Sequence, residues 1–409
     1  MGYKGVHGPA EDSEAPIFTQ FNDDSLDYRR LTTLADIDSA ALAWRALEGR
    51  CGDRLTYFQS FGWCRSWVAA FANETAALDF RIETVWRGDD LIAVWPLMVH
   101  TVAGIRVLQN LGAPHSQYCN LLCDDALLVE AITGRLLSGI ETDPSCDVAV
   151  FHPVPQRSKL AQLLGARPTI SGYNGNSALL DLTGFADAES YRTQGGKLKK
   201  RNRNRRRNHL SRLGELSFEV VWPSDPRFRN LVHQCAAMKR QWLNETGRTS
   251  SGFSTDGFED FLSTLSGDRE SFSGACLSVL RAGDTVVATE LGFLRDGHYY
   301  AYIGSFEWKL RHLSPGKVQM EMTVCWLIEN GATAYDLLGG EGEYKLSWSD
   351  RTIALRGYSL CFSWKGRFYA NAWLPHLRPL VKRLYQSAPE GLRRVIASMQ
   401  SFGIVMIGV

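Results

Sequence analysis

The stretch from Asp336 to Trp348, DLLGGEGEYKLSW, gathers side chains that can move protons. Asp336 is followed by three glycines, two glutamates and the adjacent pair Tyr344 and Lys345. Glycine allows the backbone to approach a partner closely, and a pocket can tune a carboxylate, a phenol and an ammonium for proton transfer. The same residues also fit a strand that leaves a sheet through a glycine turn, with Lys345 solvated. Both interpretations stay open on this stretch alone.

A second group of interest precedes it, at the start of an expected helix with the sequence LSPGKVQMEMTVCWLIENG. Ser314 suits the N-cap, Pro315 the first helical position and Gly331 the C-terminal cap. Backbone N–H groups, the helix dipole and the ammonium of Lys317 favour an anion at this end, and Gly316 leaves the approach open. The arrangement suits a pyrophosphate, although an ordinary capped helix has the same pattern.

Both groups belong to the second of two similar units. β-Rich runs at 78–99 and 274–294 are each joined by a short turn containing Gly and Asp, which indicates hairpins. Their cores, R-G-D-D-L-I-A-V and R-A-G-D-T-V-V-A, match nearly position for position. Each hairpin is preceded by a helix and followed in turn by a strand, a helix and a further strand. These flanking elements are expected at 58–71, 104–112, 127–139 and 147–151, and again at 230–247, 298–306, 315–330 and 334–338.

The repeated order predicts two α/β domains of one type, with mixed sheets. The predicted limits are a loose, disordered N-terminal tail at 1–30, a first domain at 31–185, a second domain at 186–364 and a basic amphipathic helical extension at 365–409. The tail lacks the apolar segment of a signal peptide.

Composition narrows the class of protein. The 409 residues are 44% hydrophobic and 22% charged, with a net charge of +1, which is typical of a soluble globular protein and gives no global field for nucleic acid. The nine cysteines form no C-x-x-C pair and the nine histidines lack ligand spacing, so buried thiols and no metal site are expected. No apolar run approaches the ~20 residues of a membrane span. A cytoplasmic location is predicted.

The second unit resembles a known superfamily. Strand order and the run SPG, helix, G-A-x-x-Y-D-L-L-x-G-E-x-x-Y-K look like the CelD-type branch of the GNAT acyltransferases, which is associated with cellulose and exopolysaccharide synthesis and has two GNAT-like domains. The likeness spans about 58–364. It implies tandem GNAT-like domains in which acetyl-CoA, as co-substrate, binds the helix start and gives its acyl group directly to an amine or hydroxyl of a saccharide or its precursor. The implied CoA-binding residues are Arg311, Ser314, Gly316 and Lys317.

Direct transfer needs a base for the acceptor, donors for the oxyanion and an acid for the leaving thiolate. The candidate bases are Asp336, Glu341 and Glu290. Asp336 also fits a structural role, accepting backbone N–H groups of the glycine turn. Glu290, within VVATELGF, also fits a solvent-facing position on a strand.

Two tyrosines and one lysine complete the catalytic candidates. Tyr344 and Tyr302 are candidates to protonate the thiolate, and Lys345 to hold an anionic acceptor or a phosphate. The first unit departs from the pattern, because Asp124 and Asp125 put negative charge where a phosphate would lie. We therefore expect the first domain to be non-catalytic, and either to be structural or to shape the acceptor groove.

Two basic segments remain. Nine of the sixteen residues at 197–212 are Lys or Arg, which predicts an exposed helix or arm that is either solvated or in contact with an anionic acceptor, a lipid phosphate or RNA. The segment from Pro375 onward is basic and amphipathic, so it either docks on the protein's own core or lies peripherally on an anionic membrane.

Two further functions compete with the acyl-CoA-dependent acyltransferase. A Fem-like aminoacyl transferase would take its acyl group from charged tRNA and use the basic run for RNA. A non-catalytic accessory protein of polysaccharide synthesis would have two degenerate GNAT-like domains. Ser314, Gly316 and Lys317 favour CoA.

Overall fold

The computed structural model describes residues 26–71, 79–124, 129–143, 145–165, 174–194, 196–248, 250–339, 343–378 and 380. A 14-stranded mixed sheet runs through these residues in the order β1-β2-β3-β4-β6-β14-β7-β13-β12-β11-β10-β8, with β5 paired to β3 and β9 to β10. Its strands are β1 (Leu26–Leu31), β2 (Asp79–Arg87), β3 (Asp90–Val102), β4 (Ile105–Asn110), β5 (Leu122–Cys123), β6 (Val148–Pro155), β7 (Asn174–Asp181), β8 (Leu216–Val221), β9 (Gly267–Asp268), β10 (Ser273–Ala282), β11 (Thr285–Arg295), β12 (His298–Phe306), β13 (Ala334–Gly339) and β14 (Arg351–Cys361).

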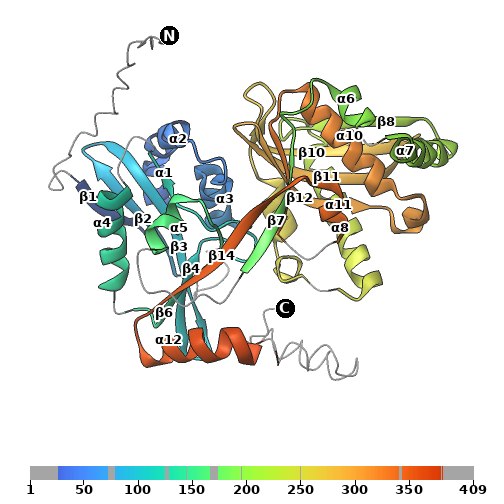
Figure 1. The fold of residues 1–409 in the computed structure, drawn as a ribbon. Coiled ribbons are helices and arrows are strands. Elements are labelled where there is room, and N and C mark those ends of the chain that lie inside the picture. The colour runs from blue at the N-terminus through green and yellow to red at the C-terminus, as the bar shows by residue number, and fades with distance from the viewer. Residues whose placement is uncertain are drawn as a thin grey trace, which may run out of the picture.

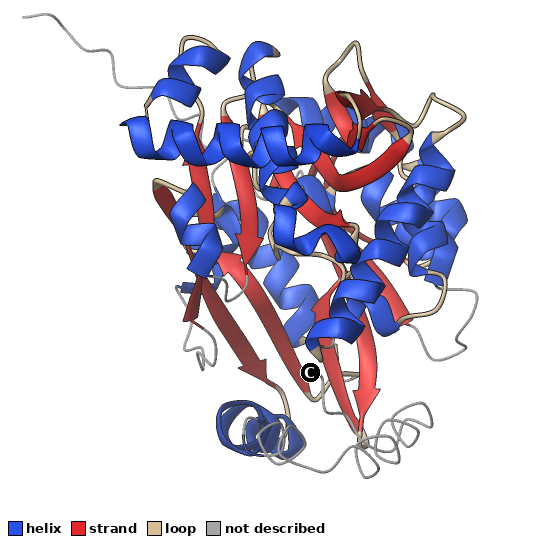
Figure 2. Ribbon diagram, turned by 90° about the vertical axis from the view of Figure 1, so that its right-hand side faces the viewer, coloured by secondary structure: helices blue, strands red, loops and turns tan. Residues whose placement is uncertain are grey.

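Helices cover both faces of the sheet (Figures 1 and 2). They are α1 (Leu34–Ser39), α2 (Ala41–Arg50), α3 (Phe61–Phe71), α4 (Val129–Glu141), α5 (Lys159–Gly165), α6 (Ala188–Thr193), α7 (Gly196–Leu210), α8 (Phe228–Thr246), α9 (Phe258–Ser263), α10 (Pro315–Glu329), α11 (Glu343–Trp348) and α12 (Trp364–Phe368), which continues as a π-helical stretch, Tyr369–Leu377. Among the described helices, none is long and apolar enough to cross a membrane.

The two predicted hairpins are confirmed, with one adjustment. Gly88 and Gly283 take nearly the same left-handed backbone angle, φ 60° and 58°, and each begins the two-residue turn of its hairpin. The hairpins also share a register shift at the same distance before the turn, between Val85 and Trp86 and between Leu280 and Arg281. The structural alignment, which places Gly88 opposite Gly283, therefore differs by one residue from the alignment of the two sequences. The glycine sets the position of the turn because it tolerates a positive φ.

Strands are exchanged between the two halves. β7 precedes the predicted domain boundary but pairs with β13 of the second half, and β14 of the second half lies between β6 and β7. In Figure 1, β7 and β14 run between the first half on the left and the second half on the right. The predicted domain limits stay a prediction, but the sheet is continuous across them.

The end of the segment predicted to be a loose tail is a strand, and residues 1–25 lie outside the described residues. Leu26–Leu31, the end of the segment expected to be loose, forms β1 and pairs with β2. Polar contacts hold this edge strand: Arg30 is bonded to Glu83 and Asp143, and the Tyr28 hydroxyl donates to Glu83. Such a strand carries little apolar alternation, which is why the sequence pattern missed it.

One hydrophobic cluster joins the halves. It contains Trp44 and Trp63 from α2 and α3 of the first half, and Phe228 and Phe261 from α8 and α9 of the second. Separate clusters lie under α4 and α5 and under α10. All nine cysteines are free and eight of them are buried, as expected for inert thiols.

A buried carboxylate lies where the halves meet. Asp336 on β13 is fully buried and accepts hydrogen bonds at one oxygen from the Tyr118 hydroxyl (2.7 Å) and from His298 (3.1 Å). Its other oxygen accepts from the Ser177 hydroxyl of β7 (2.6 Å) and from the backbone N–H of Leu338 (2.8 Å). Burial raises the pKa of Asp336, but the bonds from these donors outweigh it and hold the pKa below its usual value.

We expect Asp336→Asn to lower the free energy of unfolding by about 3 kcal/mol, because an amide cannot accept on both sides and leaves buried donors unpaired. Ser177→Ala removes a single donor and should cost about 1 kcal/mol. Urea unfolding measures both, with the exposed turn variant Asp284→Asn as control. Equal stability of Asp336→Asn and the control would contradict this role.

Candidate functional site

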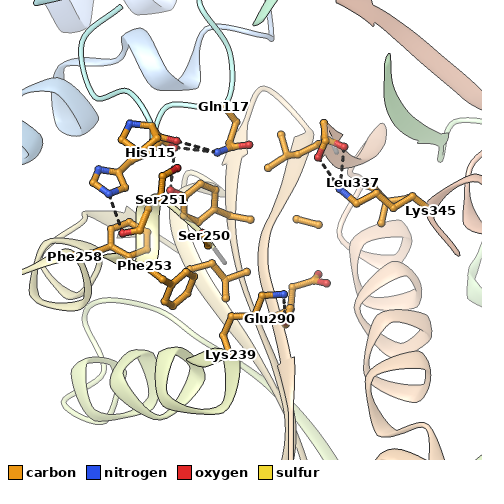
Figure 3. A pocket seen from close by; sticks show the side chains of 18 of the residues that line it. His115, Gln117, Lys239, Ser250, Ser251, Phe253, Phe258, Glu290, Leu337 and Lys345 are labelled. Carbon is orange, nitrogen blue, oxygen red and sulfur yellow. Dashed lines mark hydrogen bonds between the residues drawn. The ribbon is translucent and has the colours of Figure 1, made fainter. Parts of the chain in front are cut away.

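The candidate site lies in a wedge between two parallel strands. β12 and β13 pair only from His298 to Tyr300 and from Ala334 to Asp336, and then separate. A cavity of about 320 Å³ opens between the separated ends, lined by Ala301 to Gly304 and by Leu337 to Gly339. Figure 3 shows this cavity with the side chains around it.

Asp336 helps to keep the strands apart, although it does not line the cavity. Leu338 has a positive φ of 59°, which is costly for a residue with a side chain. The carboxylate of Asp336 holds this turn by accepting the Leu338 N–H. Of the two roles that the sequence left open for Asp336, the contacts match the structural one.

Glu290 reaches the cavity from β11. It is 3% exposed, and its two oxygens accept hydrogen bonds from the hydroxyls of Tyr299 (3.2 Å) and Tyr335 (2.8 Å). Burial raises the pKa of Glu290 to about 7, and the tyrosine bonds oppose this rise. The solvent-facing position that its strand pattern also allowed is therefore wrong, because the strand is covered on both faces.

Two lysines line the same cavity. Lys345 of α11 donates to the carbonyls of Leu338 (3.2 Å) and Gly339 (2.8 Å), and burial lowers its pKa to about 8. Lys239 of α8 lies 3.4 Å from the carbonyl of Gly304, and burial lowers its pKa as well. In Figure 3 the two side chains approach the cavity from different sides. Sequence reasoning missed Lys239, because one lysine on an amphipathic helix carries no local signal.

Tyr302 is also a lining residue, but its hydroxyl is already bonded. It donates to the backbone carbonyl of His115 in the first half (2.9 Å), and burial raises the pKa of its phenol. His115 itself lines the cavity and is stacked on Phe258 at 4.3 Å between ring centroids. The first half therefore supplies a wall of this cavity. Glu341 and the side chain of Tyr344 lie outside the described residues.

The start of α10 faces a second cavity, of about 540 Å³. Lys317 lines it together with Arg203 and Arg206 of α7. Arg203 is 3.6 Å from Glu321, and its Nη2 atom is buried without a hydrogen-bond partner among the described residues. This cavity carries positive charge at a helix N-terminus, which suits a phosphate. The sequence showed these arginines only as members of a basic run. It did not show which side chains of that helix would point toward the cavity.

The other predicted residues at this end differ from expectation in detail. Ser314 precedes α10 as predicted but makes no side-chain cap, because its backbone is left-handed (φ 58°) and not extended as in a usual N-cap. A Cβ added to Gly316 would lie 3.3 Å from the Phe306 ring, so the approach there is close. Arg311 stacks on Trp308 at 4.9 Å and lines neither cavity.

The first half has no equivalent of Glu290. With the hairpin turns aligned, Trp95 takes its position, and the Trp95 ring lies 4.8 Å from that of Phe151. Asp124 is buried and paired with Arg50 at 2.8 Å, while Asp125 lies outside the described residues. Within the described part of the chain, no group of His, Cys, Asp and Glu could hold a metal ion.

Comparisons with known proteins agree with this geometry. Residues 197–346, which lie in the second half, match the model of an acetyltransferase (GNAT) domain. A search of curated protein sequences found no match.

The fold resembles solved structures at low identity. FemX is 13% identical with a TM-score of 0.55, over 83% of this chain and 98% of FemX. The C-terminal DUF2156 domain of an Agrobacterium fabrum protein assigned as a lysylphosphatidylglycerol synthetase is 13% identical with a TM-score of 0.54, over 84% and 95% of the two chains. These likenesses concern the fold alone, and they confirm the predicted mixed α/β architecture.

The raised pKa of Glu290 predicts a pH-dependent loss of stability. A neutral Glu290 stabilises the fold below the unfolded pKa of 4.5, and this stability is lost as pH rises through about 7. Glu290→Gln cannot ionise, so its stability relative to the wild type should increase by up to about 3 kcal/mol between pH 5 and pH 8. Urea unfolding at both pH values measures the change, with exposed Glu245→Gln as control. The same difference at both pH values would contradict the raised pKa.

Proposed function

We propose that the protein is an acyltransferase that moves an acyl group from a CoA thioester, acetyl-CoA foremost, directly to an amine or hydroxyl of a saccharide or saccharide precursor. The observation that carries this proposal is the wedge cavity, which is lined by a buried carboxyl with a pKa of about 7 and by two lysines. The GNAT domain match over 197–346 supports the reaction class. The resemblance to CelD-type proteins supports the saccharide acceptor.

In the proposed reaction Glu290 is the general base. It takes the proton of the acceptor amine or hydroxyl as that atom attacks the thioester carbonyl, and a carboxylate with a pKa near neutrality suits this task. A C–N or C–O bond forms, the C–S bond breaks, and the CoA thiolate takes a proton. Lys345, with a pKa of about 8, and Tyr344 are our candidates for this acid. Tyr302, whose proton is held by the His115 carbonyl, serves as a wall.

The donor would lie across the second cavity. Lys317, Arg203 and Arg206 supply positive charge for a pyrophosphate, and the unpartnered Nη2 of Arg203 fits a phosphate oxygen. The helix α10 contributes to both cavities, because Lys317 lines the second and Met320 lines the first. The positive charge of Lys239 and Lys345 favours an acceptor that also carries an anionic group.

The central test is the turnover of Glu290→Gln. We expect thiol release from acetyl-CoA, with a panel of amino sugars and sugar alcohols as acceptors, to fall ~10² to 10⁴-fold while acetyl-CoA affinity is unchanged. Wild-type turnover should rise with pH through about 7, as the base loses its proton. Glu48→Gln, which alters a half-buried carboxyl with a raised pKa, lies outside the wedge and is the matched control. Full turnover in Glu290→Gln would exclude this base.

The same preparation tests the donor site by calorimetry. Gly316→Asp places a carboxylate and a Cβ at the crowded start of α10, so it should abolish acetyl-CoA binding. Lys317→Met should weaken binding, and exposed Lys309→Met should not. Unchanged affinity in Gly316→Asp with the fold intact would remove the donor site from α10.

A second candidate function rests on the outer face of α7. An open groove of about 630 Å³ lies there, lined by Lys200, Arg201, Arg205 and Arg212. None of these four side chains makes an ion pair with a described residue. A polyanion fits such a face, which favours an aminoacyl transferase that uses charged tRNA. The face adjoins the donor cavity, because Arg203 and Arg206 belong to the same helix.

The salt dependence of binding distinguishes the tRNA-dependent candidate function from the CoA-dependent one. Under the second candidate, tRNA binds at low salt, its affinity falls steeply with added salt, and Arg201→Gln with Arg205→Gln reduces the slope. The control is exposed Arg229→Gln, whose side chain pairs with Asp260 on another face. Under the first candidate, tRNA does not bind and acetyl-CoA does. Filter binding of tRNA at two salt concentrations, beside the calorimetry, distinguishes them.

A further inference from the structure

The helix formed by α12 and its π-helical continuation has two different faces. Its inner face is docked: Tyr369 and Ala370 are buried against Val102 and Val148 at the end of the first half's sheet. Gly366 packs so closely that an added Cβ would lie 1.9 Å from the carbonyl of Asp147. This face of the helix is therefore packed on the first half, while the two alternatives for the segment from Pro375 onward stay predictions, because most of that segment lies outside the described residues.

The outer face is apolar and uncovered by the described residues. Trp364 is 76% exposed, Phe368 50%, Leu377 40% and Leu380 57%. Seven large hydrophobic side chains are exposed in the described part of the chain, and these four, including both aromatic ones, lie within 17 residues of one another. Soluble proteins rarely leave such side chains gathered in one place without a partner.

The charges around this face have one sign. Residues 364–380 contain Lys365, Arg367 and Arg378 and no acidic residue. The neighbouring carboxylate, Asp147, is bonded to the Ser363 hydroxyl and to the backbone N–H of Arg106. A second copy of this face would bring like charges together, which opposes self-association.

We propose that this outer face, Trp364, Phe368, Leu377 and Leu380 with Lys365 and Arg367, docks on an anionic lipid surface. Helices that lie in a membrane interface combine an apolar face containing aromatic residues with flanking basic side chains, as here. The rings enter the headgroup region, where aromatic residues are favoured, and the cations meet anionic lipids. This surface is separate from the acyl-transfer site and does not rest on the function proposed for it.

The position of the helix leaves room for a flat partner. In Figures 1 and 2 the helix lies along one edge of the molecule, and Figure 1 places it at the end remote from α7. The helix therefore presents its apolar side chains from a margin and not from inside a groove. Docking there leaves the basic face of α7 free for a different ligand.

Vesicle flotation with the full chain tests the proposal. Vesicles of phosphatidylcholine mixed with phosphatidylglycerol in equal parts should carry the protein, and vesicles of phosphatidylcholine alone should carry much less. The double variant Trp364→Glu and Phe368→Glu should reduce partitioning about tenfold or more, because it removes both rings and adds like charge to the lipid. Lys365→Gln with Arg367→Gln should weaken binding to the anionic vesicles and lower its dependence on salt.

Matched controls separate the alternatives. Leu42→Glu replaces an even more exposed apolar side chain, at 84%, on the distant helix α2 and should float like the wild type. Thermal melts establish that all variants are folded. Absence of wild-type flotation overturns the proposal, as does undiminished flotation of the double variant, which would move the contact to α7 or to residues 381–409. Light scattering tests the remaining alternative. If the wild type is a dimer, the double variant is a monomer and neither binds vesicles, the partner of this face is a second copy of the chain instead.

Discussion

The structure depends on one buried carboxylate at the crossing of the two halves. Asp336 is fully enclosed and accepts hydrogen bonds from a tyrosine of the first half, a serine on the exchanged strand β7, a histidine on β12 and the backbone of its own turn. A charge with so many donors is tolerable inside a protein, and the same charge without them is very costly. The exchanged strands, the joined sheet and the turn after β13 must therefore form together.

The opening of the wedge follows from this constraint. Because Asp336 holds Leu338 in a left-handed conformation, β13 leaves β12 after three residue pairs and its carbonyls turn toward Lys345. The side chain of Glu290 borders the space between the strands, and burial raises its pKa to about 7. The raised pKa of Glu290 thus arises mainly from desolvation, and the hydrogen bonds from the two tyrosine hydroxyls oppose it.

The two halves use one architecture differently. Their hairpins share the glycine turn and the register shift, yet the position of Glu290 in one is Trp95 in the other. The aromatic pair that Trp95 makes with Phe151 fills space where a base could have stood. The first half contributes instead by closing the cavity with His115 and by holding Asp336 through Tyr118. The two halves thus share the same hairpin geometry, while only the second has a carboxyl group at this position.

The sequence by itself determined the elements that depend on local pattern. The hairpins, α10 with its proline at the start, and the alternation of helices and strands follow from turn glycines and apolar spacing, which act over a few residues. Tertiary structure decided the rest. The exchange of β7 and β14 involves partners far apart in the chain, and Tyr118 meets Asp336 across 218 positions. The environment of a carboxylate depends on its donors and its burial, and only the packed chain supplies both, which is why the four-donor enclosure of Asp336 and the raised pKa of Glu290 could not be read from the sequence.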